Sequence, residues 1–294
     1  SDAARAEYWK YANTNLFQHG IDAWWCDSTE PVVADWKQKQ KLSAKQRRDK
    51  NTAAQRNLLG RERVSSYSLL HSKGIYENQR QTTEKKRVLN LTRSSYAGQQ
   101  RYATITWSGD VSARWEVFAQ QIPAGLSFTA TGCPYWTTDI GAFFVKKKPR
   151  WFWNGQFQEG CNDLGYRELY TRRFQYGAFL PLFRSHGTDT PREIWRFGEP
   201  GDMFYDTLSK YLNLRYQLMP YIYSLAGKTT QDHYTTMRAL AFDFRTDPKA
   251  LDIKNQYMFG PAFMVCPVTT PMYYGPNSMQ LDNTVKTREV YLPE

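Results

Sequence analysis

The first residues of the chain combine a helical hydrophobic pattern with a strand-like one. Residues 3–18 carry aromatic and aliphatic side chains at helical spacing, and Gly20 is typical of the turn that follows a helix. A short apolar run over residues 21–26 follows and ends at Asp27. Because a helix that leads through a glycine turn into a buried strand is the repeating unit of parallel α/β folds, this pattern predicts such a fold.

Similar patterns continue along the chain. They predict helices over residues 67–80, 113–130 and 205–226, a loop and helix over 37–63, and strands over 88–92, 102–107 and 135–141. The stretch 144–170 is rich in Gly, Trp and basic residues, so we expect a long functional loop there. We expect a last barrel strand over 259–267 and a small β domain over 269–294.

Polar residues recur where the predicted strands stop. Arg93 follows residues 88–92, Asp110 follows residues 102–107 in the sequence WSGD, and Asp139 closes a third strand. In (β/α)8 barrels the active site is built from residues at the carboxyl ends of several strands. The pattern therefore predicts a parallel α/β fold over residues 1–268, either a barrel or a doubly wound sheet, and the polar strand ends favour the (β/α)8 barrel. A second domain is expected over 269–294.

Composition adds a ligand class. Aromatic residues make up 16% of the chain, with 10 Trp and 20 Tyr, and their flat apolar faces with polar edges suit sugar rings as well as protein cores. The net charge of +11 raises the question of a nucleic-acid partner. However, much of the excess lies in residues 37–50 and 146–148, which read as solvated surface, and no nucleic-acid motif is visible. We therefore predict no nucleic-acid partner.

The cysteines and the apolar runs argue against two further classes. The four cysteines lie far apart without a CxxC or Cys/His pairing, so we expect free thiols and no metal site. No apolar run reaches the roughly 18 residues of a membrane span, so we predict none.

Asp27 and Asp110 are the best pair of carboxylates for chemistry. Hydrolysis of a glycoside with retained configuration needs two carboxyl groups about 5 to 5.5 Å apart. Each of these residues follows an apolar strand and has a Trp within three residues, and a barrel can bring strand ends together. An Asp after a strand is also a common turn or helix-capping residue, so the residues by themselves leave both interpretations open.

Ordered segments of the chain resemble a known family. GIDAWWCDSTEP, RSSYAGQQRYATITWSGD, TTDIGAFF, FRSHG, LRYQLMPYIYSL and MFGPAFMVCPV follow in the order found in glycoside hydrolase family 31, over nearly the whole chain. The resemblance implies a retaining, exo-acting α-glycosidase, or a related lyase or transferase, that needs no cofactor. It also implies that residues 1–268 hold only the later strands of the barrel and that 269–294 begin a C-terminal β-sandwich.

The resemblance also implies roles for single residues. The Asp of the family's W-x-D-x-x-E segment falls on Asp27, the nucleophile, and that of its W-x-G-D segment falls on Asp110, the general acid/base. The residues implied in sugar binding are Trp24, Trp25, Arg93, Trp107, Asp139, Phe143, Arg184 and His186. Each also has an ordinary structural alternative, such as packing, a turn or a salt bridge.

Departures from the common α-glucosidase pattern concern the substrate. The extra Trp24 before Trp25 would narrow the space around the C6 group of a sugar. In this respect the sequence resembles the branch of the family that removes α-xylose from xyloglucan-type oligosaccharides. An α-glucosidase is the alternative, and a non-catalytic carbohydrate-binding fragment is an alternative of another class. Ala142 stands where the family more often has Gly.

The resemblance also implies a partner. The family's N-terminal β-sandwich and first barrel strands have no counterpart in this sequence, and an incomplete barrel would expose unpaired strand edges. We therefore expect the chain to associate with that N-terminal part, besides its oligosaccharide substrate. A polysaccharide substrate favours a periplasmic or extracellular setting.

Overall fold

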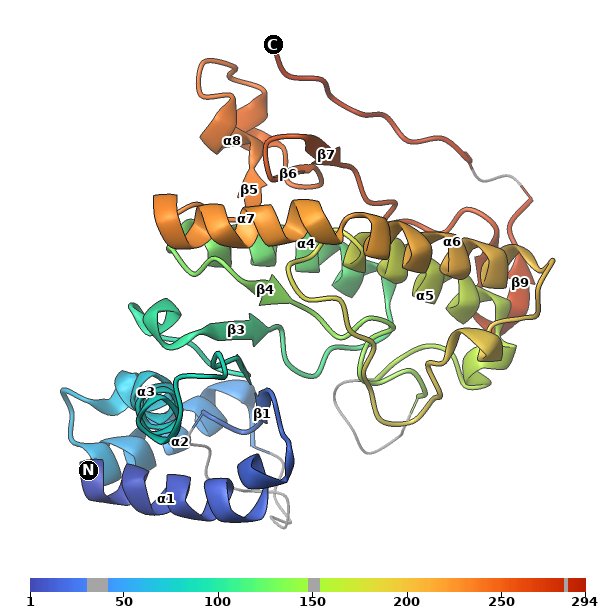
Figure 1. Cartoon of the computed structure of the whole chain (residues 1–294). Coiled ribbons are helices and arrows are strands. Elements are labelled where there is room, and N and C mark those ends of the chain that lie inside the picture. Colours follow the sequence, from blue (N-terminus) through green and yellow to red (C-terminus); the bar gives the residue numbers. More distant parts are fainter. Residues whose placement is uncertain (31–41, 148–153, 283–284) are drawn as a thin grey trace. The chain divides into compact units, whose positions relative to one another are not determined.

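The computed structural model describes residues 1–30, 42–147, 154–282 and 285–294, which fall into two units, residues 1–107 and 108–294 (Figure 1). The elements of the first unit are α1 (Asp2–Asn15), η1 (Phe17–His19), β1 (Trp24–Cys26), α2 (Ala44–Leu59), η2 (Val64–Ser66), α3 (Tyr67–Thr82), β2 (Asn90–Thr92), η3 (Gln99–Tyr102) and β3 (Thr104–Trp107). Within the described residues of this part of the chain, the predicted helices and strands are confirmed, with strands shorter than expected; residues 37–41 of the predicted 37–63 segment lie outside them.

The strands of the first unit form a parallel sheet. Trp24 of β1 lies opposite Asn90 of β2, which lies opposite Thr104 of β3. Because all the strands run in the same direction, the residues after Cys26 and Thr92 emerge at the same edge of the sheet. This is the arrangement that a barrel requires for its active site.

The second unit begins with the helix that was predicted over 113–130. Its elements are α4 (Trp115–Ala130), β4 (Trp136–Thr137), η4 (Gly160–Asn162), α5 (Leu164–Gly177), η5 (Ile194–Arg196), α6 (Met203–Gln217), α7 (Met219–Asp232), β5 (Met237–Ala239), α8 (Leu240–Asp243), η6 (Ala250–Asp252), β6 (Tyr257–Phe259), β7 (Phe263–Val265), β8 (Tyr274–Gly275), η7 (Pro276–Ser278) and β9 (Met279–Gln280). Aromatic side chains such as Phe118, Tyr166 and Tyr257 fill its core.

Three predictions for this part of the chain are wrong in detail. The expected loop 144–170 ends early, because Asp163 caps α5 by accepting a hydrogen bond from the N–H of Gly165; residues 148–153 lie outside the described residues. The expected helix 205–226 is divided at Leu218, because Pro220 has no N–H to continue the helical bonds. The expected barrel strand over 259–267 is β7, which pairs antiparallel with β6. The domain boundary after residue 268 stays a prediction.

Two buried carboxylates, Glu168 on α5 and Asp163 at its N-cap, hold the segment that follows β7. Glu168 accepts hydrogen bonds from the backbone N–H groups of Met272, Tyr273 and Tyr274 at 2.8, 3.0 and 2.8 Å. Asp163 accepts from the N–H groups of residues 277 and 278 at 2.8 and 3.1 Å. The carboxylates thus satisfy backbone donors that burial would otherwise leave unpaired, and they fix the 272–278 segment on α5.

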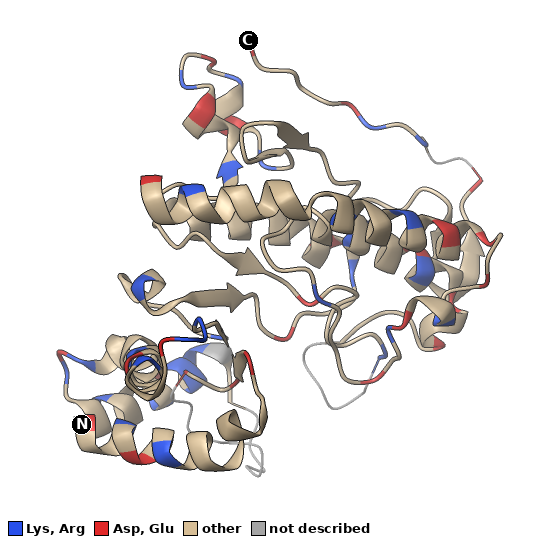
Figure 2. Ribbon diagram, viewed as in Figure 1, with Lys and Arg blue, Asp and Glu red and all other residues tan. Residues whose placement is uncertain are grey.

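Charged residues are spread along the elements of both units. Figure 2 shows Lys and Arg on many elements, with Asp and Glu among them. Residues 37–41 and Lys148, which belong to the predicted basic segments, lie outside the described residues. Within the described ranges no helix is long and apolar enough to cross a bilayer, and no group of at least three His, Cys, Asp and Glu side chains is arranged for a metal ion.

Candidate active site

Asp27 follows β1 directly and forms an ion pair with Arg93. The Nη1 atom of Arg93 lies 3.3 Å from Oδ1 of Asp27. The pairing follows from the sheet, because Cys26 and Thr92 are register partners and Asp27 and Arg93 are the next residue on each strand. Ser28 adopts a left-handed φ of 52° and donates its N–H to the same Oδ1 at 2.7 Å. The Asp27 carboxylate is therefore oriented from two directions.

Glu30 is a site residue that the predictions did not include. Its carboxylate pairs with the Nη2 atom of Arg93, so this arginine bridges two acids. Behind it, the Thr29 hydroxyl lies 2.7 Å from that of Thr92 and 3.0 Å from that of Ser94, which ties the turn after β1 to the turn after β2. The signal for Glu30 was present, because it is the last residue of the W-x-D-x-x-E segment.

The two tryptophans before Asp27 lie on opposite faces of β1. Trp25 is 51% exposed, and its ring meets that of Trp107 edge-on at 6.1 Å and 79°. Trp24 packs against Trp9, and its indole N–H donates to Oε1 of Gln79 at 2.8 Å. Because alternate residues of a strand point to opposite faces, this placement argues against the expectation that Trp24 contacts a sugar beside Asp27.

Asp110 lies in the second unit, in the turn after β3. Gly109 adopts a left-handed φ of 75°, a conformation that favours glycine, and the half-buried Asp110 follows. The next residue, Val111, accepts hydrogen bonds from the N–H groups of Phe143 and Phe144 at 2.8 and 3.1 Å. The chain after Asp110 therefore runs beside Phe143. The separation between Asp27 and Asp110 stays a prediction.

Asp139 is fully buried and pairs with Arg184. Nη1 of Arg184 lies 2.6 Å from Oδ1 of Asp139, whereas the buried Oδ2 atom has no hydrogen-bond partner among the described residues. Burial raises the pKa of Asp139 to about 7, and the charge of Asp110 adds to the increase, while Arg184, Arg192 and Arg173 oppose it. Loss of solvent therefore outweighs the ion pair in setting the pKa of this carboxyl.

His186 and Phe143 lie on two neighbouring segments, residues 140–143 and 185–188, and their rings are in contact. Their ring centroids lie 5.4 Å apart at an interplanar angle of 48°. The segments form a parallel bridge between Ile140 and Ser185, and the N–H of Thr188 donates to the carbonyl of Phe143 at 3.1 Å. The predicted residues Asp139, Phe143, Arg184 and His186 therefore come together in the second unit.

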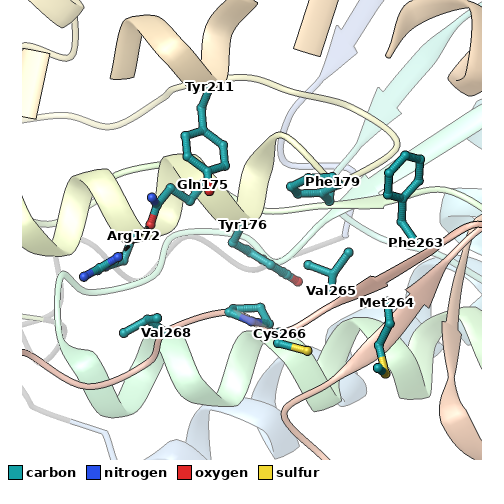
Figure 3. A pocket seen from close by; sticks show the side chains of 11 residues that line it. Arg172, Gln175, Tyr176, Phe179, Tyr211, Phe263, Met264, Val265, Cys266 and Val268 are labelled. Carbon is teal, nitrogen blue, oxygen red and sulfur yellow. Dashed lines mark hydrogen bonds between the residues drawn. The ribbon is translucent and has the colours of Figure 1, made fainter. Parts of the chain in front are cut away.

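A cavity elsewhere in this unit is separate from these residues. It has a volume of about 240 Å³ and lies between α5, α6 and the β7 segment (Figure 3). Its lining residues are Arg172, Gln175, Tyr176, Phe179, Tyr211, Phe263, Met264, Val265, Cys266, Pro267 and Val268. Among the described residues that line it, none is a predicted site residue.

Relatives of known classification match most or nearly all of the chain. An alpha-xylosidase of Saccharolobus solfataricus is 39% identical over 292 residues, which are 99% of this chain and 35% of the relative. Alpha-glucosidase 2 of Bacillus thermoamyloliquefaciens is 28% identical over 254 residues, which are 86% of this chain and 29% of the relative. The chain thus spans about a third of the length of these curated relatives.

Structural and family comparisons agree with these relatives. The crystal structure of a GH31 alpha-xylosidase from Xanthomonas citri matches with a TM-score of 0.76 and 39% identity, over 94% of this chain and 29% of the other. The family model of the glycosyl hydrolases family 31 TIM-barrel domain matches residues 1–225, and that of the family's C-terminal domain matches residues 233–294. These matches confirm the predicted barrel and the C-terminal domain. The chain belongs to glycoside hydrolase family 31.

Proposed function

We propose that the chain is the carboxylate-bearing part of a retaining exo-α-glycosidase that removes terminal α-linked xylose from xyloglucan-type oligosaccharides. The observation that carries the proposal is the Asp27 carboxylate, which Arg93 and the Ser28 N–H orient at the carboxyl end of a parallel strand. Because the chain spans about a third of its curated relatives, the activity is proposed for the complete enzyme.

The proposed reaction is a double displacement. Asp27 attacks the anomeric carbon while Asp110 protonates the departing glycosidic oxygen, which leaves a xylosyl ester on Asp27. In the second step Asp110 takes a proton from water, and the water oxygen displaces Asp27 from the sugar. The guanidinium of Arg93 offsets the negative charge of Asp27 and Glu30, so these acids can lie close together before the sugar binds.

The remaining residues are proposed to bind the sugar. Arg184 and His186 offer hydrogen-bond donors to hydroxyl groups, and the ion pair between Arg184 and Asp139 holds the guanidinium in place. The ring of Phe143 beside His186 supplies an apolar surface. Trp25 and Trp107 form an aromatic wall in the unit that carries Asp27.

Covalent trapping tests the nucleophile. A fluorinated α-xylosyl donor forms an ester on the nucleophile, and this ester hydrolyses slowly. Incubation with the complete enzyme should therefore label Asp27, as read by mass spectrometry of the enzyme's peptides. The Asp27→Asn variant should take up no label. Label on another carboxylate would overturn the assignment, and an enzyme that neither takes up label nor cleaves α-glycosides would overturn the proposed function.

The aromatic wall supports xylose over glucose as the terminal sugar. Glucose carries a hydroxymethyl group that xylose lacks, and the proposal is that Trp25, whose ring meets that of Trp107 edge-on, narrows the space for this group. A group of this size changes discrimination by about 1 to 3 kcal/mol, so kcat/KM for an aryl α-xyloside should exceed that for the aryl α-glucoside by about 10- to 200-fold. The alternative is an α-glucosidase, the class named for one relative. A higher kcat/KM for the aryl α-glucoside than for the aryl α-xyloside would establish it.

A further inference from the structure

Arg192 joins the two segments that carry the predicted sugar-binding residues of the second unit. Its Nη1 donates to the carbonyl of Thr190, and its Nη2 donates to the carbonyls of Ala142 and Phe143, the latter at 3.4 Å. These carbonyls belong to the segment after β4 and to the segment after His186. A single guanidinium thus spans both segments.

The backbone of Arg192 is fixed as well. Its carbonyl accepts a hydrogen bond from the hydroxyl of Tyr170 at 2.7 Å, and the same hydroxyl lies 2.8 Å from Oγ of Ser185. Tyr170 is fully buried on α5 and stacks on Phe197 at 3.9 Å. Arg192 is therefore held at its backbone by a rigid core residue, while its side chain reaches toward the site.

Gly187 provides independent support for this arrangement. A Cβ atom at this position would overlap the guanidinium of Arg192 and would lie 2.7 Å from the carbonyl oxygen of Ala142. The guanidinium therefore lies across the backbone next to His186, in space that only glycine leaves open. Ala142 itself has a left-handed φ of 65°, and a non-glycine residue keeps such a conformation only where its surroundings hold it.

The chemistry of arginine suits this position. A planar guanidinium presents a fork of several donors that can satisfy carbonyls in different directions, whereas the ammonium of lysine is a compact point charge. The positive charge of Arg192 also acts on Asp139, where it lowers the pKa against the effect of burial. Both the fork and the charge therefore act on groups of the candidate site.

We infer that Arg192 is a positioning residue, which sets the distance between the Phe143 and His186 segments so that both meet the sugar in the transition state. The inference rests on the proposed function but concerns a residue that the sequence did not single out. Misplacement of binding groups by about 1 Å can cost about 100-fold in rate, which sets the expected size of the effect.

The test compares variants of the complete enzyme with an aryl α-xyloside as substrate. Arg192→Met should lower kcat/KM by about 100-fold, with most of the loss in kcat. Arg192→Lys keeps the charge but not the fork, so it should lose less. Gly187→Ala displaces the guanidinium without removing it and should lower kcat in the same direction. Circular dichroism at the assay temperature confirms that each variant is folded.

Arg196→Met is the matched control, because Arg196 is exposed and lies only four positions further along the chain. Its kcat/KM should stay within about twofold of the wild-type value. If Arg192→Met and Arg192→Lys stay within the same range while the wild type is active, the positioning role is refuted and the proposed function stands. A folded wild type without α-glycosidase activity would instead refute the proposed function, and this inference with it.

Discussion

Asp139 is buried so completely that its ionisation should affect folding. Its pKa in the folded protein is raised to about 7 from the ordinary value of 3.8, chiefly by burial. The folded state therefore holds this proton more tightly than the unfolded state. The stabilisation from this group is complete below about pH 4 and is lost as the pH rises through about 7.

The Asp139→Asn variant tests this pH dependence, because an amide does not ionise. As the pH rises from about 4 to about 8, the wild type should lose stability relative to the variant. The measurement is the urea midpoint of unfolding of both proteins at a series of pH values. Midpoints that differ by the same amount at every pH would show that Asp139 does not titrate in this window.

Asp110 should matter most for substrates whose leaving group departs poorly without a proton. A general acid typically contributes about 10²- to 10⁴-fold, but a nitrophenolate leaves almost without protonation. Asp110→Ala should therefore lose about that factor in kcat/KM with a xylosyl oligosaccharide and much less with a nitrophenyl α-xyloside. Asp27→Ala is the control and should lose activity on both. Equal losses on the two substrates in the Asp110 variant would contradict its role as the acid.

For single residues, the sequence predicted positions along strands well but did not predict which way a side chain points or which distant groups it contacts. The strand-end pattern correctly brought Asp27 and Arg93 together, because register partners in a parallel sheet lead to the same edge. The resemblance treated Trp24 and Trp25 alike, although strand alternation turns one of them toward Trp9. Arg192 could not be found from the sequence, because its role depends on where distant carbonyls point.

At the scale of the helix, the same substitution should have opposite effects at two glycines. A Cβ on Gly165 of α5 would overlap the carbonyl oxygen of Gly275 and would lie 3.1 Å from Phe157, whereas a Cβ on Gly227 of α7 meets nothing within 4 Å. Gly227→Ala should therefore stabilise the protein by about 1 kcal/mol, the difference in helix propensity. Gly165→Ala should destabilise it by about 1 to 3 kcal/mol, because overpacking outweighs the propensity.

Denaturant unfolding of both alanine variants measures the two effects under identical conditions. Both substitutions remove the same backbone freedom from the unfolded chain. The difference between their changes in the free energy of unfolding therefore reports the packing of α5 against the segment after β7. Two changes of the same sign would show that this packing relaxes without cost.

The helices that were hardest to predict are those without a simple amphipathic pattern. α3 and α4 bury one face, and the periodicity of their sequences predicted both. α5 buries Tyr166, Glu168 and Arg173 together with most of its other residues, so no polar face marks it as a helix. The strands β6 and β7 are three residues each, and apolar runs of that length do not distinguish a parallel from an antiparallel partner.

At the scale of the whole molecule, the net charge of +11 needs an explanation that is compatible with a neutral sugar. Figure 2 shows basic and acidic residues spread along the described parts of both units. Several of the basic side chains are paired locally, as in the Lys45–Asp49 and Lys228–Asp232 pairs along helices. Such pairs contribute to a solvated surface and add little to the binding of a ligand.

This charge distribution predicts catalysis that is almost independent of salt. A neutral xyloside displaces no counterions when it binds, whereas a nucleic acid releases several and its affinity falls steeply with ionic strength. Between about 0.05 and about 0.5 M NaCl, kcat/KM of the complete enzyme for an aryl α-xyloside should change by less than about twofold. A parallel titration with duplex DNA should show at most weak binding that salt abolishes. A tenfold fall of kcat/KM over this range would mean that long-range charge assists the substrate, and the basic surface would then belong to the function of the enzyme.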